Sequence, residues 1–426
     1  MKFIADLHIH SKWSRATSKS LCLEELDRWA DDKGILVMGT GDFTHPAWFK
    51  EIKTKLEPAE SGLYRLKNKY KLKTLKGTFA ETRFLLTVEI SGIYSRGGRA
   101  RRVHNIVLAP DMATAEKIIA QLSLIGNLRS DGRPILGLDS EELAKIVLEI
   151  NSRAVIIPAH VWTPWFSLFG SMSGFDSLEE CFGKMSKHIF ALETGLSSDP
   201  SMNWRLSALD NLALISNSDS HSLQKIGREA NIFDTELSYE GIMGAIKSGA
   251  PNQKSKVKNQ KSKFVATIEF FPEEGKYHYD GHRACGVVFS PEETEKHKSL
   301  CPKCGKPVVV GVLNRVAKLS DRKTPKIAQN FYHESVGRVP YYNLVPLDEV
   351  VSEALGVGTA SKKVKEKYNN LIVKFGSELN ILLNVSPKEL ESAGESRIAE
   401  AVRRLREGRV NIKPGYDGEY GEVSIF

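Results

Sequence analysis

The sequence predicts an α/β fold built around a closed barrel of alternating strands and helices. Seven short apolar, β-rich runs recur in the first 235 residues, and a helical stretch follows most of them. Near-continuous apolar strands that alternate with helices are typical of a parallel sheet covered on both faces. Polar residues that can bind metal ions stand at the ends of the runs. Seven such units favour a closed β/α barrel over an open sheet.

The strands and helices of this barrel can be placed in order along the chain. The apolar runs are Lys2–Leu7, Ile35–Thr40, Arg83–Ile90, Val103–Ala109, Ala154–Pro158, Ile189–Leu192 and Leu212–Ser216. Between them, Asp139-Ser-Glu-Glu142 and Ser177-Leu-Glu-Glu180 have the pattern of helix capping boxes. A long insertion at about 46–80 follows the second run, and its basic residues alternate as on one face of an extended strand.

The remainder of the chain predicts three smaller parts after a barrel domain of residues 1–249. Residues 250–263 are polar and lysine-rich, which indicates a linker. Residues 264–316 contain three of the five cysteines and predict a small metal-binding module. Residues 317–426 predict a mostly helical domain with helices over Leu347–Leu355, Lys362–Phe375 and Ser396–Glu407.

Composition and charge limit the classes of protein that the chain can represent. Of its 426 residues, 41% are apolar and 26% are charged, which excludes wholesale disorder. Apolar runs fall short of the roughly 18 residues that a membrane span needs. Asp6 interrupts the segment where a signal peptide would need an apolar core, so we expect a cytoplasmic protein that is not attached to a membrane. The net charge of +8 permits a polyanionic partner.

Metal-binding side chains are concentrated at the ends of the predicted strands. Six of the eleven histidines lie there, together with several carboxylates. The set is His8, His10, Asp42, His45, Glu89, His104, His160, Glu193, Asp219 and His221. Because alternation along a strand puts His8 and His10 on one face, both aim at one point. The strand ends of a β/α barrel surround a shared mouth, where imidazoles and carboxylates can hold several metal ions.

This ordered set resembles the polymerase-and-histidinol-phosphatase (PHP) metallophosphoesterases. The resemblance covers about residues 1–235 and implies a distorted (β/α)7 barrel with two to three divalent ions, zinc, manganese or magnesium. It implies that His8, His10, Glu89 and Asp219 hold one ion, and that Glu89, His104 and His160 hold a second. His221, with Asp42 or His45, would complete a third site, although two residues separate Asp42 from His45 where the family often has an adjacent pair. Asp6, Asp42 and Glu193 are then the candidate catalytic or orienting carboxylates.

Longer motifs extend the resemblance over nearly the whole chain to the endonuclease Q family. The segments are Met-Gly-Thr-Gly-Asp-Phe-Thr-His-Pro (38–46), Leu-Glu-Thr-Gly-Leu-Ser-Ser-Asp-Pro (192–200), Ser-Asn-Ser-Asp-Ser-His (216–221) and Pro-Gly-Tyr-Asp-Gly-Glu-Tyr-Gly (414–421). This resemblance implies a DNA-repair nuclease that cuts on the 5′ side of deaminated bases (uracil, hypoxanthine and xanthine) and of abasic sites. It implies damaged DNA as the partner, with replication or repair proteins as further candidates, and a monomer is favoured.

The cysteines near residue 300 have the spacing of a structural zinc site. His282 and Cys285 precede the tight turn Cys301-Pro-Lys-Cys304-Gly, with His278 as an alternative to His282. Tetrahedral zinc takes sulfur and nitrogen ligands from two such short segments. With all four ligand positions filled, the site predicts a zinc-ribbon-like module with a structural role.

Basic and aromatic residues suggest how DNA would be bound. Arg96, Arg99, Arg101 and Arg102 precede the fourth strand, and Lys67 and Lys69 lie in the insertion, so both tracts could follow phosphates. Trp13, Trp48, Trp162 and Trp165 lie near predicted metal ligands and could wall a pocket for an extruded base. The alternatives are a small-molecule phosphomonoesterase on the same barrel and a non-catalytic DNA-binding module. Neither needs all of the features together, so we expect a metal-dependent endodeoxyribonuclease.

Overall fold

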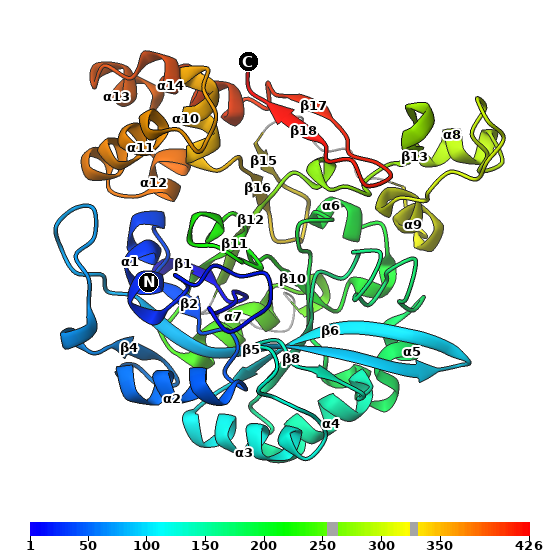
Figure 1. The fold of residues 1–426 in the computed structure, drawn as a ribbon, viewed down its shortest axis with the longest axis horizontal. Coiled ribbons are helices and arrows are strands. Elements are labelled where there is room, and N and C mark those ends of the chain that lie inside the picture. The colour runs from blue at the N-terminus through cyan, green and yellow to red at the C-terminus, as the bar shows by residue number, and fades with distance from the viewer. Residues whose placement is uncertain (254–262, 324–330) are drawn as a thin grey trace.

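A distorted barrel forms the centre of the protein, and a small lobe and a helical domain lie on one side of it (Figure 1). The structure, a computed structural model, describes residues 1–253, 263–323 and 331–426. Within these residues the barrel strands are β1 (Lys2–Asp6), β2 (Val37–Gly39), β5 (Arg83–Arg96), β6 (Arg99–Ala109), β8 (Val155–Pro158), β9 (Ala191–Glu193) and β10 (Ala213–Ile215). Each of the seven predicted apolar runs therefore contributes a strand.

The barrel is not purely parallel, which corrects the prediction. β1, β2 and β5 pair in parallel, as do β9 and β10, but β6 runs antiparallel to both β5 and β8. The barrel is also distorted where β8 meets β9, since Val161 N donates to Glu193 O at 3.0 Å outside a regular ladder. On the other side it closes through a bridge between Ile9 and Ser220.

The reversal of β6 has a local cause in the sequence Gly97-Gly98. Both glycines adopt positive φ, 61° and 71°, as a two-residue hairpin turn requires. β5 and β6 therefore form one long hairpin with its tip at Arg96–Arg99, and Figure 1 shows it extending beyond the barrel beside α5. The arginine tract that was expected to precede a separate strand is the tip and return arm of this hairpin.

Helices cover the barrel on its outside. They are α1 (Leu23–Lys33), α2 (Pro46–Lys55), α3 (Met112–Ser123), α4 (Ser140–Ile150), α5 (Leu178–Phe182), α6 (Pro200–Asn203) and α7 (Tyr239–Ser248). Asp139 and Ser177 cap α4 and α5 by accepting from Glu142 N and Glu180 N, as predicted. The insertion folds as α2, β3 (Leu56–Pro58) and β4 (Tyr64–Leu66), so its basic tract is extended over three residues only.

An outer sheet continues from β1 and connects the barrel to the rest of the chain. β11 (Ala230–Asp234) pairs with β1 and with β12 (Lys263–Glu269), and β16 (Tyr341–Asn343) and β15 (Tyr332–His333) follow. β7 (Ile135–Leu136) pairs with β5. β12, where the metal module was expected to begin, thus belongs to the barrel's sheet. The expected linker of 250–263 lies mostly outside the described residues.

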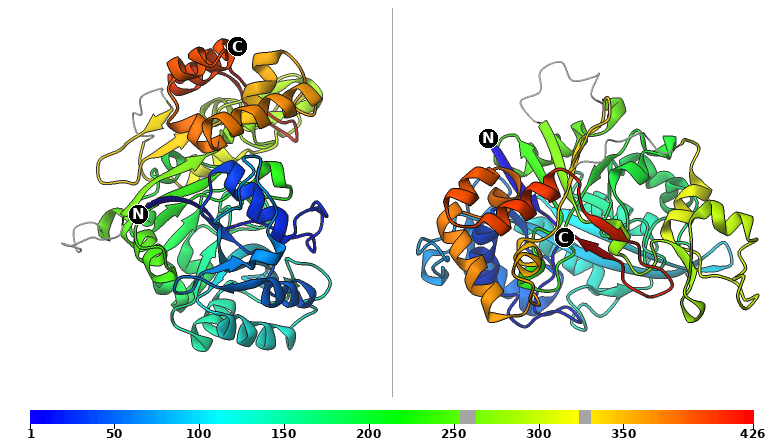
Figure 2. Two further views of the ribbon diagram at one scale, coloured as in Figure 1. Left: turned by 90° about the vertical axis from the view of Figure 1, so that its left-hand side faces the viewer. Right: turned by 90° about the horizontal axis from the view of Figure 1, so that it is seen from above.

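The helical domain and the small lobe lie at opposite ends of one side of the barrel, with the C-terminal hairpin between them (Figures 1 and 2). The lobe contains β13 (Asp280–His282), β14 (Val287–Phe289), α8 (Pro291–Lys296) and α9 (Val312–Leu319). The domain contains α10 (Leu347–Leu355), α11 (Lys362–Phe375), α12 (Glu378–Leu383), α13 (Pro387–Ser392) and α14 (Ser396–Arg406). The predicted helices are confirmed here to within a residue. The hairpin of β17 (Asn411–Lys413) and β18 (Glu422–Ser424) returns to the lobe, where Tyr279 N donates to Gly415 O at 3.0 Å.

Candidate metal centre

Two groups of metal-binding side chains meet at the mouth of the barrel and share one residue. The first group is His8, His10, Glu89 and Asp219, and the second is Glu89, His104 and His160. In each group the potential ligand atoms lie within 4.8 Å of one another. These are the two sets that the family resemblance implied, with Glu89 common to both.

The fold explains why these residues converge. His8 and His10 follow β1, where the bridge between Ile9 and Ser220 keeps the chain extended and both imidazoles on one face. Glu89 lies in β5. His104 lies in the middle of β6, opposite Ser91 of β5 and directly before the segment of β6 that pairs with β8. Because β6 is antiparallel to β8, His104 lies beside the end of β8, which His160 follows.

The donor set fits divalent metal ions. His8 Nε2 is buried and lacks a hydrogen-bond partner among the described residues, while carboxylate oxygens of Glu89 and Asp219 each lie 3.7 Å from it. A metal ion between these atoms would satisfy a nitrogen that is otherwise costly to bury. Imidazoles combined with carboxylates suit zinc, manganese or iron.

Ionised carboxylates characterise the site. Burial alone would raise the pKa of Glu89, but His104 and Arg133 bring that pKa well below its ordinary value. Burial alone would lower the pKa of His8, but the carboxylates of Glu193 and Glu89 raise it well above its ordinary value. The site therefore holds negative charge that can ligate a cation.

Two of the three candidate catalytic carboxylates orient the ligand histidines. His8 Nδ1 lies 3.0 Å from Glu193 Oε1, and His10 Nδ1 lies 3.0 Å from Asp42 Oδ1. Asp42 is itself fixed by Ser11 N, which donates to it at 2.7 Å. Because Nδ1 of each ring is occupied in this way, Nε2 is turned toward the metal group, the arrangement that carboxylate–histidine–metal triads use.

Asp6 has a different place. Its oxygens accept from Ser218 N at 3.1 Å and Gly227 N at 3.0 Å, so it anchors the loop that carries Asp219. Burial raises the pKa of this carboxyl to about 6, although those backbone donors favour its ionised form.

The third metal site is not assembled among the described residues. Asp42 is bonded to His10, as above, and His45 Nε2 lies 3.2 Å from Arg129 O, with its ring stacked on Trp13. His221 does lie close, its ring 4.6 Å from that of His10, but its Nδ1 faces its neighbour Asp219 O at 2.9 Å. Asp42 is thus occupied by His10 and Ser11, whereas the buried Nδ1 of His45 lacks a hydrogen-bond partner among the described residues, so a third metal site at Asp42 or His45 stays a prediction.

Backbone strain marks the same residues. Asp42, His160 and Asp219 adopt positive φ angles of 51°, 30° and 46°. Non-glycine residues rarely adopt such angles, and those that do cluster at functional sites.

A cavity of about 420 Å³ opens beside the second metal group. Its lining includes Arg15, Asp131, Arg133, Thr163, Trp165 and Phe166 together with His104, His160 and Asp219. Arg133 donates from Nη1 to Glu89 Oε2 at 3.1 Å, and Phe166 lies with its ring 4.8 Å from that of His104. Sequence reasoning missed Arg133 because it lies in a loop of Ser, Asp, Gly and Pro without a strand pattern to place it.

The four tryptophans predicted to wall a base pocket divide into two pairs. Trp165 lines the cavity and is 38% exposed, and Trp13 is 39% exposed at the rim beside His45. Trp48 and Trp162 are wrong as wall residues because both are fully buried. Their indole N–H groups donate to Gly41 O and to Asn203 Oδ1, each at 2.8 Å, as expected of core tryptophans.

The basic residues predicted to bind DNA also differ among themselves. The guanidinium of Arg96 donates to Cys181 O and Glu141 Oε2 within the barrel, and its contact with DNA stays a prediction. Arg101 donates to Gly174 O and, with Arg99, lines a polar cavity of about 340 Å³.

The other basic candidates pack against neighbouring groups. The exposed Arg102 guanidinium lies 5.5 Å from the ring of Phe166, which is itself a cavity-lining residue. Lys67 donates to Thr54 O at 2.7 Å and Lys69 lies over Tyr70, so both are engaged within the insertion. Arg99, Arg101 and Arg102 are therefore the stronger candidates for DNA contacts.

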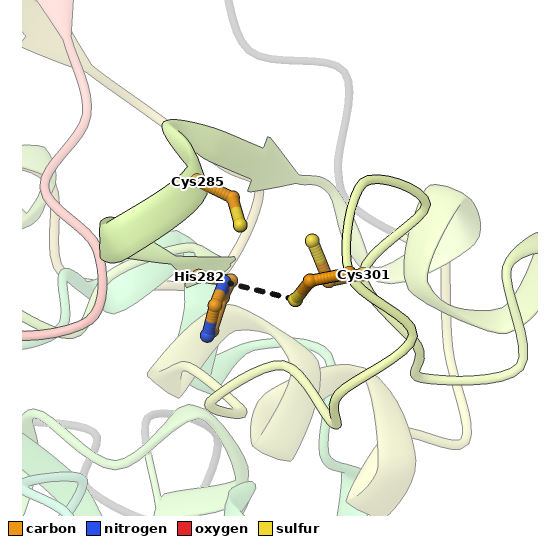
Figure 3. A group of neighbouring side chains, drawn as sticks. His282, Cys285 and Cys301 are labelled. Atoms are coloured by element: carbon orange, nitrogen blue, oxygen red, sulfur yellow. Dashed lines mark hydrogen bonds between the residues drawn. The ribbon is translucent and has the colours of Figure 1, made fainter.

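The predicted structural zinc ligands form a third group. His282, Cys285, Cys301 and Cys304 have ligand atoms within 4.8 Å of one another, and Figure 3 shows the labelled side chains turned toward a common point. Cys304 Sγ lies 3.7 Å from His282 Nδ1. The alternative ligand His278 is outside this group. The thiolate and imidazole set suits tetrahedral zinc.

Helices of the described residues lack the length and apolar character needed to cross a membrane.

Comparison with known proteins finds relatives along the whole chain. Residues 346–409 match the family model of the MJ0043 C-terminal domain. The uncharacterized protein MJ0043 of Methanocaldococcus jannaschii is 36% identical over 268 residues, which are 62% of this chain. The match spans only 31% of that relative's length.

Two solved structures match from end to end. The crystal structure of PfuEndoQ, a lesion-specific endonuclease from Pyrococcus furiosus, has a TM-score of 0.83 and 31% identity, covering 100% of this chain and 95% of that one. The structure of Endonuclease Q with a 27-mer duplex carrying an abasic lesion at the active site has a TM-score of 0.81 and 31% identity, covering 100% and 97%. This likeness, over the barrel, the small lobe and the helical domain alike, shows that the chain belongs to the endonuclease Q family of endonucleases.

Proposed function

We propose that this protein is a metal-dependent, lesion-specific DNA endonuclease that cuts the phosphodiester on the 5′ side of abasic sites and of uracil, hypoxanthine and xanthine. The observation that carries the proposal is the pair of ligand groups joined by Glu89, three members of which, His104, His160 and Asp219, line the 420 Å³ cavity. Membership of the endonuclease Q family supports the substrate class.

The residues of the site have distinct tasks in this proposal. His8, His10, Glu89 and Asp219, with His104 and His160, would hold divalent ions, which supply Lewis-acid activation of the scissile phosphate and of water. Glu193 and Asp42 keep the imidazoles in their ligating orientation. Arg133 is 26% exposed at its side chain and lies against Glu89, where its second face can neutralise a phosphate.

The cavity wall supplies the selection of damaged nucleotides. Trp165 and Phe166 present aromatic faces beside the second ligand group, and a nucleotide turned out of the duplex could stack there. Extrusion costs a few kcal/mol and is least costly for a mispaired or missing base, which favours lesions over intact pairs. Arg99, Arg101 and Arg102 on the long hairpin would contact flanking phosphates.

A nicking assay tests the proposal. End-labelled duplexes with an abasic site, uracil, hypoxanthine or xanthine are compared with an undamaged duplex, before and after chelation and with manganese, magnesium or zinc restored. We expect cleavage 5′ to each lesion that is lost on chelation and regained with metal. Equal cleavage of undamaged DNA would contradict lesion specificity. Hydrolysis of a chromogenic phosphomonoester without nicking would favour a small-molecule phosphatase.

A further inference from the structure

One wall of the metal-centre cavity is a loop, residues 163–176, that contacts the ligand histidines directly. His104 N donates to Phe166 O at 3.1 Å, and Thr163 Oγ1 lies 3.2 Å from His160 Nδ1. Phe166 adopts a φ of 61°, which places its ring against that of His104. The loop's position therefore sets both the shape of the cavity and the surroundings of the second ligand group.

Arg315 holds this loop from the opposite side. It belongs to α9 of the small lobe, is 8% exposed, and directs its guanidinium at the barrel. Nε donates to Phe169 O at 2.9 Å, and Nη2 donates to Phe175 O at 2.9 Å and to Asp176 Oδ1 at 2.6 Å. Since these acceptors belong to one loop, a single side chain fixes it at three points.

A second contact joins the lobe to the same loop. The ring of Trp165 meets that of Tyr277 edge-on, with centroids 5.7 Å apart. Trp165 is one of the cavity-lining residues. The lobe therefore contacts the part of the loop that lines the cavity, in addition to the residues that Arg315 holds.

α9 is in turn fixed to the strand that carries a zinc ligand. Asp280 accepts from Gly311 N and from Asn314 Nδ2, each at 2.5 Å, and so holds the first turn of α9. Asp280 is in β13, which ends at His282. A continuous set of contacts thus connects the zinc group, through Asp280 and Arg315, to the wall of the cavity.

We propose that Arg315 is a positioning residue, through which the zinc-binding lobe holds the lesion-recognising wall in its working place. The proposal rests on the proposed function, and it assigns the lobe a role in catalysis at the barrel besides any contact with DNA. A planar guanidinium can serve three acceptors in fixed directions, which an ammonium group cannot reproduce. Small displacements of positioned groups can cost about 100-fold in rate.

Single-turnover cleavage of the abasic-site duplex tests the role of Arg315. For Arg315→Met we expect the cleavage rate constant at saturating enzyme to fall at least tenfold, with the Kd for undamaged duplex changed less than twofold. Arg315→Lys should restore part of the rate. Lys318→Met is the matched control, since Lys318 lies one turn further along α9 and lines the same polar cavity. It removes an equal charge and should cleave at the wild-type rate.

Coupling to zinc is tested with Cys304→Ser. This variant should lose the lobe's zinc, keep the barrel metals by elemental analysis, and show the same reduced rate. Because both changes act through one set of contacts, the double variant should be no slower than either single variant. A wild-type rate in Arg315→Met, or losses that multiply in the double variant, would overturn the proposal.

Hydrogen exchange gives a readout that is independent of cleavage. Amides of 163–176 should exchange faster in Arg315→Met and Cys304→Ser but not in Lys318→Met. Unchanged exchange in Arg315→Met would refute the role of Arg315, whatever the cleavage assay shows. Failure of the wild type to cut any lesion would refute the proposed function and would leave the exchange result as a separate test. Should Arg315→Met fail to fold, Arg315→Lys and Asp176→Asn support or overturn the proposal by the same measurements.

Discussion

Two carboxylates, Asp42 and Glu193, hold the imidazoles of the proposed ligands His10 and His8. Asp42 fixes His10 through Nδ1 and is held in turn by Ser11, so its replacement leaves the ligands present but less well oriented. For Asp42→Asn we expect metal affinity or activity to fall about 10–100-fold, the usual cost of losing such a partner. Metal titration together with the nicking assay measures it. Glu193→Gln should behave alike, and wild-type metal affinity in both variants would contradict the orienting role.

Glu89 is the residue on which both metal groups depend. Glu89→Gln removes the shared negative charge and also leaves Arg133 without its carboxylate partner. We expect loss of metal from both groups and a fall in cleavage at least about tenfold larger than that of Asp42→Asn, because a ligand matters more than its support. Elemental analysis should still find the lobe's zinc. A full complement of barrel metal in Glu89→Gln would show that Glu89 is not the bridging ligand.

The positions of some side chains near the site could be predicted from the sequence, and those of others could not. His8 and His10 were predictable because strand alternation fixes their common face. Trp48 and Trp165 both lie near candidate ligands in sequence, yet one is buried and the other is 38% exposed, since burial depends on tertiary packing. Arg133 was missed because its role arises only when its loop folds against β5.

At the scale of elements, strand positions were predictable and strand directions were not. Each predicted run forms a strand, but β6 reverses because Gly97-Gly98 makes a tight hairpin turn. Glycine pairs occur both in tight hairpin turns and in phosphate-binding loops, so the glycines alone do not distinguish the two. The same reversal brings His104 to the mouth of the barrel. His104 therefore lies with the other candidate ligands as predicted, although the predicted direction of its strand was wrong.

We expect the small lobe to depend on zinc because its own core is small. The buried apolar residues of its cluster are Val287, Phe289, Cys301 and Val308, and one of these is a ligand. Structural zinc then contributes directly to folding free energy. Cys301→Ser should release zinc and make residues 272–311 sensitive to limited proteolysis, while the barrel keeps its melting transition. Unchanged zinc content would contradict the assignment.

A buried pair of acids, Glu229 directly before β11 and Glu269 at the end of β12, predicts a pH-dependent stability. Burial raises the pKa of Glu269 to about 8, although Thr267 and Thr194 donate to its carboxylate, and burial and Glu269 raise that of Glu229 as well. The folded state thus retains protons that the unfolded state releases above its ordinary pKa near 4.5. Stability should therefore fall as the pH rises from about 5 to 8.

Replacing one of the two acids tests this dependence. Glu269→Gln keeps the hydrogen-bond acceptor but cannot ionise, so its melting temperature should decline less than that of the wild type between pH 6 and 8.5. Thermal melts at a series of pH values measure the difference. Parallel curves for the two proteins would show that Glu269 does not titrate in this range.

At the scale of the whole molecule, the helical domain is anchored to the barrel by a buried ion pair. Lys33 in α1 and Glu378 in α12 lie 2.6 Å apart, with side chains 3% and 4% exposed. Glu378 also accepts from Tyr368 Oη at 2.7 Å and from Leu347 N at 3.2 Å. The helices themselves were predictable from periodicity, but this contact joins residues 345 positions apart, and no local pattern reveals it.

The buried pair predicts how strongly the two domains are coupled. Lys33→Met leaves the Glu378 charge buried without its partner, which should lower the free energy of unfolding by about 3–5 kcal/mol. The double variant Lys33→Met/Glu378→Gln replaces the buried carboxylate with a neutral amide of the same shape, which still has one oxygen to accept hydrogen bonds. It should therefore be more stable than Lys33→Met. The Lys225–Glu349 pair is a matched control, since it also joins barrel to helical domain at 2.6 Å but is 37% and 25% exposed. Lys225→Met should therefore cost only about 0–1 kcal/mol. Denaturant unfolding of the full chain measures all three variants, and equal losses in Lys33→Met and Lys225→Met would mean that burial does not set the strength of this anchor.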